Sequence, residues 1–157
     1  MTKVTIEWEQ GIIKFSDIKT KTSKYLDNKG FYAIITGKFD SNSKHYKEIS
    51  LRYIGMAFDQ TVRERVQQKH DAYIDILKYL SENPGFEALV MVGCITKCSQ
   101  DRITKQLMED IEACLIFRNK PKNNIVKKYN YAGRSITINN TGDFRPLKEI
   151  SDITEET

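Results

Sequence analysis

Two apolar segments in the first half of the chain predict a pair of β-strands. Residues 30–36 have the sequence Gly-Phe-Tyr-Ala-Ile-Ile-Thr and are followed by the turn-rich stretch Gly-Lys-Phe-Asp-Ser-Asn-Ser. Residues 49–57 form a second apolar run, which contains a glycine at position 55. Two such runs on either side of a turn-rich loop indicate an antiparallel hairpin. Gly55 would let the backbone turn, or let a ligand approach closely.

Helical spacing of apolar residues follows in two longer segments. The first predicted helix begins near Asp59 or Thr61, either of which can cap it, and ends before residues 83–85 (Asn-Pro-Gly). The second begins near Ser99 or Asp101 and continues to about residue 117, before Pro121 stops it. A largely buried strand over residues 86–95 separates them. Their core stripes are Val66, Tyr73, Ile76, Leu77 and Leu80 in the first helix, and Ile103, Leu107, Ile111 and Leu115 in the second.

The two ends of the chain carry weaker patterns. Residues 1–29 predict a short strand or hairpin and a loop, while residues 125–126 and 135–138, with a turn at 140–142, suggest a closing hairpin. The order β-β-α-β-α-β predicts an α+β fold with a small, mostly antiparallel central sheet flanked by helices. We divide the chain into an N-terminal extension (1–29), a central domain (30–127), and a C-terminal hairpin with an acidic tail (128–157) packed on that domain.

Composition excludes several protein classes. The chain has 157 residues, of which 39% are hydrophobic and 29% charged, as in ordinary globular domains. No apolar run approaches the roughly 20 residues that span a bilayer. Acidic residues interrupt the first thirty positions, where a secretory signal would be apolar, so we expect no membrane association and a cytoplasmic location. The three cysteines, with only two histidines, make structural zinc improbable, and reduced thiols are expected.

Charge is distributed unevenly near the C-terminus. Between positions 118 and 128 there are five cations and no acid, whereas the last ten residues contain four acids and one lysine. The net charge of +4 does not by itself imply a polyanionic partner. A local cationic stretch fits a surface that faces phosphates, although a solvated loop is the commoner meaning of such a run.

Short motifs inside these elements point to a function. Tyr32 ends the sequence Gly-Phe-Tyr in the first strand of the hairpin, and Tyr53 begins Tyr-Ile-Gly in the second. Arg65 lies near the start of the first helix, in the sequence Arg-Glu-Arg-Val. Glu112 lies in the second helix, with a proline nine residues later and Asn124 twelve residues later.

These motifs, in this order, resemble the GIY-YIG nuclease superfamily, which includes homing endonucleases, excision-repair incision proteins and some restriction enzymes. The resemblance covers about residues 30–125. It implies a stand-alone, metal-dependent endonuclease that hydrolyses phosphodiester bonds in DNA. Its central domain would then be the nuclease domain, and a homodimer is possible.

The resemblance also implies roles for individual residues. Glu112 would hold Mg²⁺, or another divalent ion such as Mn²⁺, and Arg65 would stabilise negative charge on the scissile phosphate. Either Tyr32 or Tyr53 would deprotonate the attacking water, and the other would hold the water or the phosphate. The sequence leaves both assignments open.

Further residues take supporting roles in the same comparison. His70 would pass the proton onward, or it is a surface histidine. Asn124 would tie the loop after the proline to the active-site wall by hydrogen bonds. Contacts to nucleic-acid phosphates are expected from Arg63, Lys69, Arg118, Lys120 and Lys122.

The sequence departs from the family pattern in three places. Twenty residues separate Tyr32 from Tyr53, which suggests an insertion within residues 37–47. Arg65 lies farther from the hairpin glycine than is usual, which leaves Arg63 as a rival, although the valine after Arg65 favours Arg65. His70 follows Arg65 by five residues, where some members of the family place a histidine or tyrosine after four. Two alternatives therefore stay open: a non-catalytic nucleic-acid-binding module that retains the nuclease fold, and a structural or protein-interaction domain.

Overall fold

The computed structural model describes residues 1–154. These residues form a seven-stranded sheet and three α-helices. The strands are β1 (Thr2–Trp8), β2 (Ile13–Lys14), β3 (Gly30–Asp40), β4 (His45–Ala57), β5 (Phe86–Cys98), β6 (Ile136–Gly142) and β7 (Ile150–Ile153). The helices are α1 (Val62–Gln67), α2 (Asp71–Glu82) and α3 (Lys105–Asn119), with a 3₁₀ turn at Phe15–Asp17.

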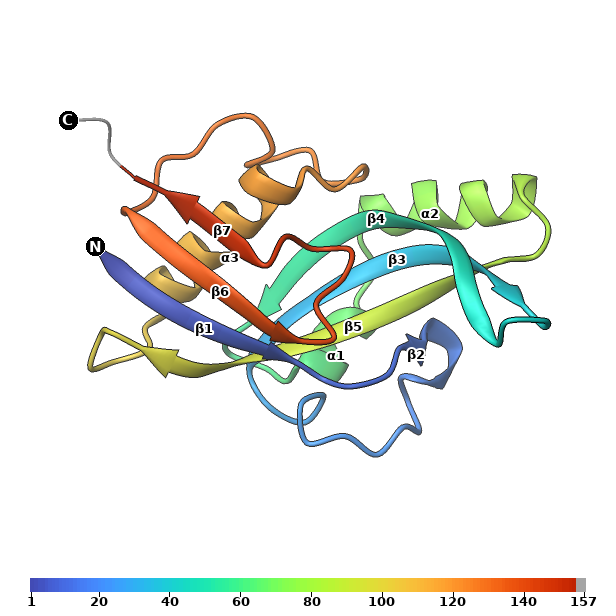
Figure 1. Ribbon diagram of the computed structural model, residues 1–157, viewed down its shortest axis with the longest axis horizontal. Helices are drawn as coiled ribbons and strands as arrows, with labels where there is room; N and C mark the ends of the chain where they lie inside the picture. The colour runs from blue at the N-terminus through green and yellow to red at the C-terminus, as the bar shows by residue number, and fades with distance from the viewer. Residues whose placement is uncertain (155–157) are drawn as a thin grey trace.

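The sheet is larger and more mixed than the sequence predicted. Its strand order is β4-β3-β5-β1-β6-β7, with β2 paired to β5, and the strands curve into a half-barrel (Figure 1). β1 and β6 run parallel, whereas the other pairs are antiparallel. The prediction of a small, mostly antiparallel sheet flanked by helices was therefore wrong. All three predicted segments of the chain contribute strands to this one sheet.

The position of β1 explains the error. Its side chains alternate between the core and the surface, with Thr2, Val4, Ile6 and Trp8 buried, so its sequence does predict a strand. Periodicity does not reveal which strands lie beside it, however. The free side of β5 accepts β1, and β1 in turn aligns β6, with Val4 opposite Ile138. The two ends of the chain thus widen the sheet.

The predicted hairpin and its third strand are adjacent in the sheet. β3 pairs with β4 in an antiparallel register that places Tyr32 opposite Gly55, and β5 lies antiparallel on the other side of β3. Both hairpin strands are longer than the apolar runs. Most of residues 37–47 therefore extend the strands, and only a short turn separates them.

Helix boundaries differ from the predictions at two points. Thr61 caps α1 by accepting a hydrogen bond from the Glu64 amide, but the helix stops at Gln67, and a separate helix, α2, begins at Asp71. The second predicted helix begins later, because Thr104 caps α3, whereas Ser99 instead accepts a bond from the Lys3 amide. The end of α3 at residue 119 fits the predicted stop before Pro121.

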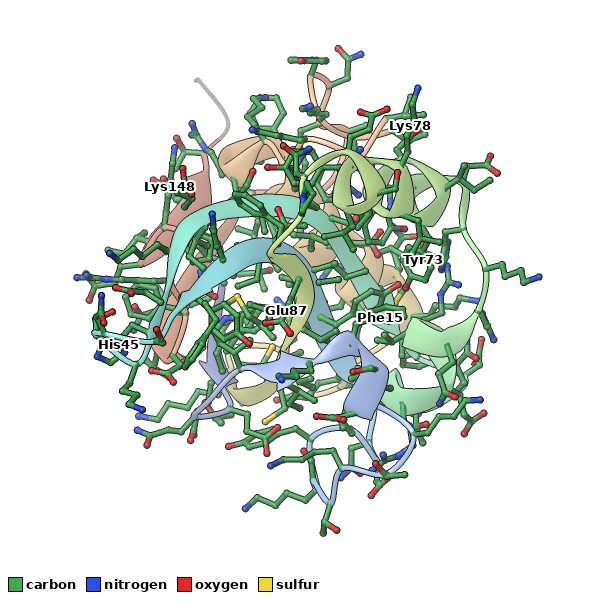
Figure 2. The ribbon with its side chains drawn as sticks, turned by 90° about the vertical axis from the view of Figure 1, so that its right-hand side faces the viewer. Phe15, His45, Tyr73, Lys78, Glu87 and Lys148 are labelled. Atoms are coloured by element: carbon green, nitrogen blue, oxygen red, sulfur yellow. The ribbon has the colours of Figure 1, made fainter. Side chains whose placement is uncertain are left out.

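The two faces of the sheet are covered by different helices. α3 packs with Phe31 and Ile54 in one hydrophobic cluster, whereas α1 and α2 pack with Tyr32 and Ile34 in another. This division follows from the strand period, which sends neighbouring residues to opposite faces. Figure 2 looks toward α2 and shows Tyr73 beside Phe15, with ring centroids 5.6 Å apart.

Further predictions concern the C-terminal strands, the acidic tail and membrane-spanning helices. β6 and β7 form an antiparallel pair near the C-terminus, but the predicted hairpin was different. Residues 125–126 belong to no strand, residues 140–142 belong to β6, and residues 143–149 connect the two strands. The acidic tail includes Glu155 and Glu156, which lie outside the described residues. Within residues 1–154, none of the helices combines the length and apolar character needed to cross a bilayer.

Candidate active site

A cavity of about 270 Å³ lies at the edge strand β4, where elements from both faces of the sheet meet. Tyr53 from β4, His70 from the α1–α2 junction, Glu112 from α3 and Asn124 and Lys127 from the following loop all line it. A second cavity, of about 490 Å³, shares Glu112 and Lys127 with the first and adds Arg65 to its lining. The carboxylate on α3 and the groups on the opposite face therefore converge around the edge of the sheet.

Four aromatic rings, two of which line the first cavity, pack together beside it. The Tyr53 centroid lies 6.1 Å from Tyr32, 5.6 Å from His70 and 6.3 Å from Tyr73, and His70 lies 5.0 Å from Tyr73. Sequence reasoning assigned Tyr73 to the helix core and missed its place here. The only available signal was its position three residues after His70, about one helical turn.

Gly55 makes room for the Tyr32 ring. A Cβ atom at residue 55 would lie 2.4 Å from Tyr32 Cζ and 2.5 Å from its hydroxyl oxygen, far inside van der Waals contact. The glycine of the Tyr-Ile-Gly motif is therefore required by the tyrosine that faces it across the hairpin. Two motifs that are separate in the sequence form one packing unit.

The two motif tyrosines differ in their access to a substrate. Tyr32 has none of its surface exposed, and its hydroxyl has no hydrogen-bond partner of regular geometry within residues 1–154. Burial raises the pKa of Tyr32 far above its ordinary value of 10. Burial, and next the Glu112 carboxylate, also raise the pKa of Tyr53, whereas Arg65 lowers it. Of these two tyrosines, Tyr53 lines the cavity of about 270 Å³ and Tyr32 does not.

Arg65 and His70 are joined directly, with 2.6 Å between Arg65 Nη1 and His70 Nε2. Since a guanidinium can only donate, Nε2 accepts this bond and the ring proton lies on Nδ1. Burial, followed by the Arg65 charge, lowers the pKa of His70 below 6.5, in agreement with a neutral ring. Arg65 Nη1 also donates to the Gln68 side-chain oxygen at 2.9 Å, so His70 and Gln68 together orient Arg65. This role of His70 differs from the proton relay suggested by the resemblance.

Arg63 is engaged elsewhere, although it lies on the same short helix. Its guanidinium donates to the Asp27 carboxylate at 2.9 Å and to the Lys21 carbonyl at 2.7 Å, and it also bonds the carbonyl of Ile18. These contacts hold the loop before β3 against α1. Of the two candidate arginines, Arg65 is the one beside the cavity, and the donors of Arg63 are occupied by protein groups.

Glu112 forms an ion pair with a residue to which sequence reasoning gave no role in the site. Lys127 Nζ lies 3.0 Å from Glu112 Oε1, and the carboxylate side chain is only 17% exposed. Burial raises the pKa of Glu112, while Lys127, Arg65 and the Met56 amide lower it. Two cations thus surround one carboxylate. The acid-free cationic run contained the signal for this pair, since Lys127 belongs to it.

Glu112 is the carboxylate that both cavities share, so it would be the protein's ligand for a divalent ion that also contacts a substrate. Among the described residues, no group of three Asp, Glu, His or Cys side chains could hold a metal ion. Mg²⁺ commonly takes only one or two carboxylates and completes its shell with water and substrate phosphate. Glu112 supplies one such ligand. Asn123 also lines this cavity, but its side-chain oxygen, which has no partner within residues 1–154, is buried.

Asn124 attaches the loop after α3 to the edge of the sheet. Its side-chain oxygen accepts from the Ile54 amide at 2.9 Å, and its nitrogen donates to the Ile54 carbonyl at 3.0 Å. The amides of Lys122 and Asn123 bond the carbonyls of Leu51 and Arg52 in the same strand. The loop therefore covers the free edge of β4 beside Tyr53, and Asn124 makes the kind of tie that the resemblance implied.

The predicted nucleic-acid contacts fall into two groups. Lys69 and Lys122 are exposed and free to meet phosphates. Arg118 instead bonds the Asp152 carbonyl, and Lys120 bonds the Lys128 carbonyl while its ammonium lies 4.0 Å from the Phe117 ring centroid. Arg118 therefore ties α3 to β7, whereas Lys120 stabilises the loop, and both also contribute positive charge.

Comparison with protein-family models, curated proteins and solved structures finds no match to this chain. The resemblance to GIY-YIG nucleases therefore depends on the motif residues alone. What the geometry adds is their placement around one edge of the sheet.

Proposed function

We propose that the protein is a metal-dependent endonuclease that hydrolyses phosphodiester bonds in DNA. The observation that carries this proposal is the meeting of Tyr53, Arg65 and Glu112 around adjoining cavities. They supply the three requirements of the reaction, namely a group that contacts the attacking water, a fixed cation for the phosphoryl oxygens, and a carboxylate for a metal ion. A cytoplasmic location belongs to the same proposal.

Tyr53, rather than Tyr32, contacts the attacking water in this proposal. Tyr53 lines the cavity, whereas the hydroxyl of Tyr32 is enclosed by its neighbours. Phenolate formation at pH 7 costs roughly 4 kcal/mol for an unperturbed tyrosine, and burial adds to this cost. The Arg65 charge lowers the pKa of Tyr53 and opposes the effect of burial. Tyr32 has a structural role beneath Tyr53.

Arg65 and Glu112 act on the phosphate. The guanidinium, held by His70 at 2.6 Å, is oriented before the substrate arrives and offers paired donors to phosphoryl oxygens. A divalent ion on Glu112, when bound, would withdraw charge from the scissile phosphate. The exposed Lys69 and Lys122 would add contacts to the DNA backbone that carry no sequence information.

One observation favours the non-catalytic alternative. Lys127 already neutralises Glu112, so the carboxylate is satisfied without a metal ion. A binding module would keep the cationic surface and lose turnover. Its affinity for DNA would fall by about 0.9 log unit per log unit of salt for each phosphate neutralised.

Cleavage of supercoiled plasmid in Mg²⁺ tests the proposal, with two arginine variants as a matched pair. Arg65→Lys should lower the rate about 100-fold, because lysine cannot reproduce the oriented pair of donors. Arg63→Lys should keep the rate and lower only the melting temperature, because Arg63 holds the loop before β3.

Three outcomes would decide between the alternatives. Equal loss of activity in both variants would remove Arg65 from the mechanism. Salt-sensitive DNA binding without nicking, in Mg²⁺ or Mn²⁺, would establish the binding module instead. Absence of any salt-sensitive affinity would leave a structural or protein-interaction domain.

A further inference from the structure

The ammonium of the loop residue Lys127 lies beside Glu112, the proposed metal ligand. It is 3.0 Å from Glu112 Oε1, and Lys127 lines both cavities of the candidate site. The Met56 amide and the Arg65 charge also favour the ionised carboxylate. In the free protein Lys127 is therefore the ion-pair partner of Oε1.

This arrangement opposes the binding of a divalent cation. The positive charges of Arg65 and Lys127 both act on this one carboxylate. An arriving dication meets repulsion from both, and to bind Oε1 it must replace the ammonium there. Phosphates from DNA would provide a new partner for the lysine.

The two residues before Lys127 make little contact with the rest of the protein. Ile125 and Val126, which precede it, are 83% and 72% exposed, so they anchor the loop weakly. Lys127 itself has φ of 69°, in the left-handed region that residues other than glycine rarely adopt. Asn124 attaches the loop to β4 three residues earlier, and one residue later the Lys128 carbonyl accepts a bond from the Lys120 ammonium. The Glu112 ion pair is thus a main contact that positions Lys127.

We propose that Lys127 is a resident counter-ion that must leave Glu112 before a divalent metal ion binds there, which makes metal binding depend on the arrival of DNA phosphate. This inference rests on the proposed role of Glu112 as the metal ligand. It assigns Lys127 a positioning role and a regulatory one: the free protein holds metal weakly, and the freed ammonium then faces the cavity that receives the phosphate.

Titration of the DNA-free protein with Mn²⁺, followed by the electron paramagnetic resonance signal of the free ion, tests the proposal. Lys127→Met removes the ammonium and keeps the length of the apolar stem. It should bind Mn²⁺ at least tenfold more tightly than the wild type, and a tenfold change corresponds to about 1.4 kcal/mol. Lys127→Gln, which keeps a hydrogen-bond donor for Glu112, should show a gain in the same direction.

Two controls make the result specific to Glu112. Lys128→Met removes a neighbouring charge on the same loop, whose ammonium contacts the Lys122 carbonyl, and should bind Mn²⁺ as the wild type does. The double variant Lys127→Met with Glu112→Gln should lose the gain. Thermal melting shows whether each variant is folded, and the Gln variant decides the test if the Met variant is not.

The outcomes separate this inference from the proposed function. Unchanged Mn²⁺ affinity in both folded Lys127 variants, or a gain that survives Glu112→Gln, would overturn the inference. A Glu112-dependent gain together with no DNA cleavage would uphold it and remove the nuclease proposal. DNA cleavage by the wild type without any gain in Mn²⁺ affinity in the Lys127 variants would overturn the inference and support the nuclease proposal.

Discussion

Two carboxylates on α3 are paired with cations in similar ways, yet they lie in different surroundings. In the Asp110 corner, formed by Asp110, Gln106 and Arg134, the Asp110–Arg134 distance is 2.7 Å and the Asp110 side chain is 10% exposed. In the Glu112 corner, formed by Glu112, Lys127, Tyr53, Arg65 and His70, the ion-pair distance is 3.0 Å and the Glu112 side chain is 17% exposed. Both pairs fasten α3 to the segment that follows it.

The difference between the corners lies in what else each carboxylate meets. Residues two apart in an α-helix project about 200° apart, so the two side chains leave α3 in different directions. Asp110 also accepts a bond from Gln106 on its own helix, and its partner Arg134 is held near the Tyr131 hydroxyl. Glu112 lines two cavities with an arginine and a tyrosine. Both carboxylates are largely buried and ion-paired, so burial and ion pairing do not by themselves identify a reactive site. The residues around each carboxylate make the distinction.

The largest effects should come from exchanging each acid for its amide. Glu112→Gln should lower DNA cleavage by about 1,000-fold or more, equivalent to about 4 kcal/mol, because the metal loses its charged ligand. Its free energy of unfolding should change by less than about 1 kcal/mol, since relief of desolvation offsets the lost pair. Asp110→Asn should show the opposite pattern. Its rate of DNA cleavage should stay within about twofold of the wild-type rate, and its free energy of unfolding should fall by about 2 kcal/mol. Plasmid nicking and urea unfolding give the two readouts. Equal effects of the two substitutions on both readouts would remove the distinction between the corners.

The next largest effect concerns Asn124, which holds the loop that carries Lys127. Asn124→Ala should lower the free energy of unfolding by about 3 kcal/mol, because it leaves the buried Ile54 amide and carbonyl without partners. Asn123→Ala is the matched control. The Asn123 side-chain oxygen has no partner within the described residues, so its removal should change stability by less than about 1 kcal/mol. Similar urea midpoints for the two variants would show that the side-chain tie to β4 contributes little.

The smallest effect is a pH dependence confined to the Glu112 corner. Burial and Arg65 lower the pKa of His70 below 6.5, so the unfolded chain takes up this proton first as the pH falls. The stability contributed by neutral His70 is complete above about pH 7 and is lost as the pH falls through the folded pKa. The loss should stay below about 1 kcal/mol, because the ring is partly exposed.

Urea unfolding between pH 7.5 and 5 isolates this contribution. His70→Asn should flatten the pH dependence relative to the wild type, whereas substitution of the exposed His45 by Asn should leave it unchanged. If the free energy of unfolding changed with pH in the same way in the wild type and in His70→Asn, His70 would not be a neutral histidine bound to Arg65. Asp71, which lies next to the ring and raises its pKa, is unchanged in both variants.

The amino-acid sequence by itself determined the local elements and the order of the motifs. Alternation and apolar runs predicted β3, β4 and β5, and the order of the motifs put one motif tyrosine on each hairpin strand. The spacing of Glu112 and Asn124 identified two residues that do lie beside Tyr53. These features are local or nearly so, because side-chain periodicity and turn chemistry are set by neighbouring residues.

Tertiary structure alone decided which distant segments meet. β1 carries a clear strand pattern, but its parallel pairing with β6 depends on the free side of β5, which no local period encodes. The break after α1 brings His70 to Arg65, whereas in one continuous helix residues five apart would point about 140° away from each other. The Glu112–Lys127 pair depends on how the loop folds back after Asn124. Packing competes with local preference at each of these places, and contacts between segments far apart in the chain determine the outcome.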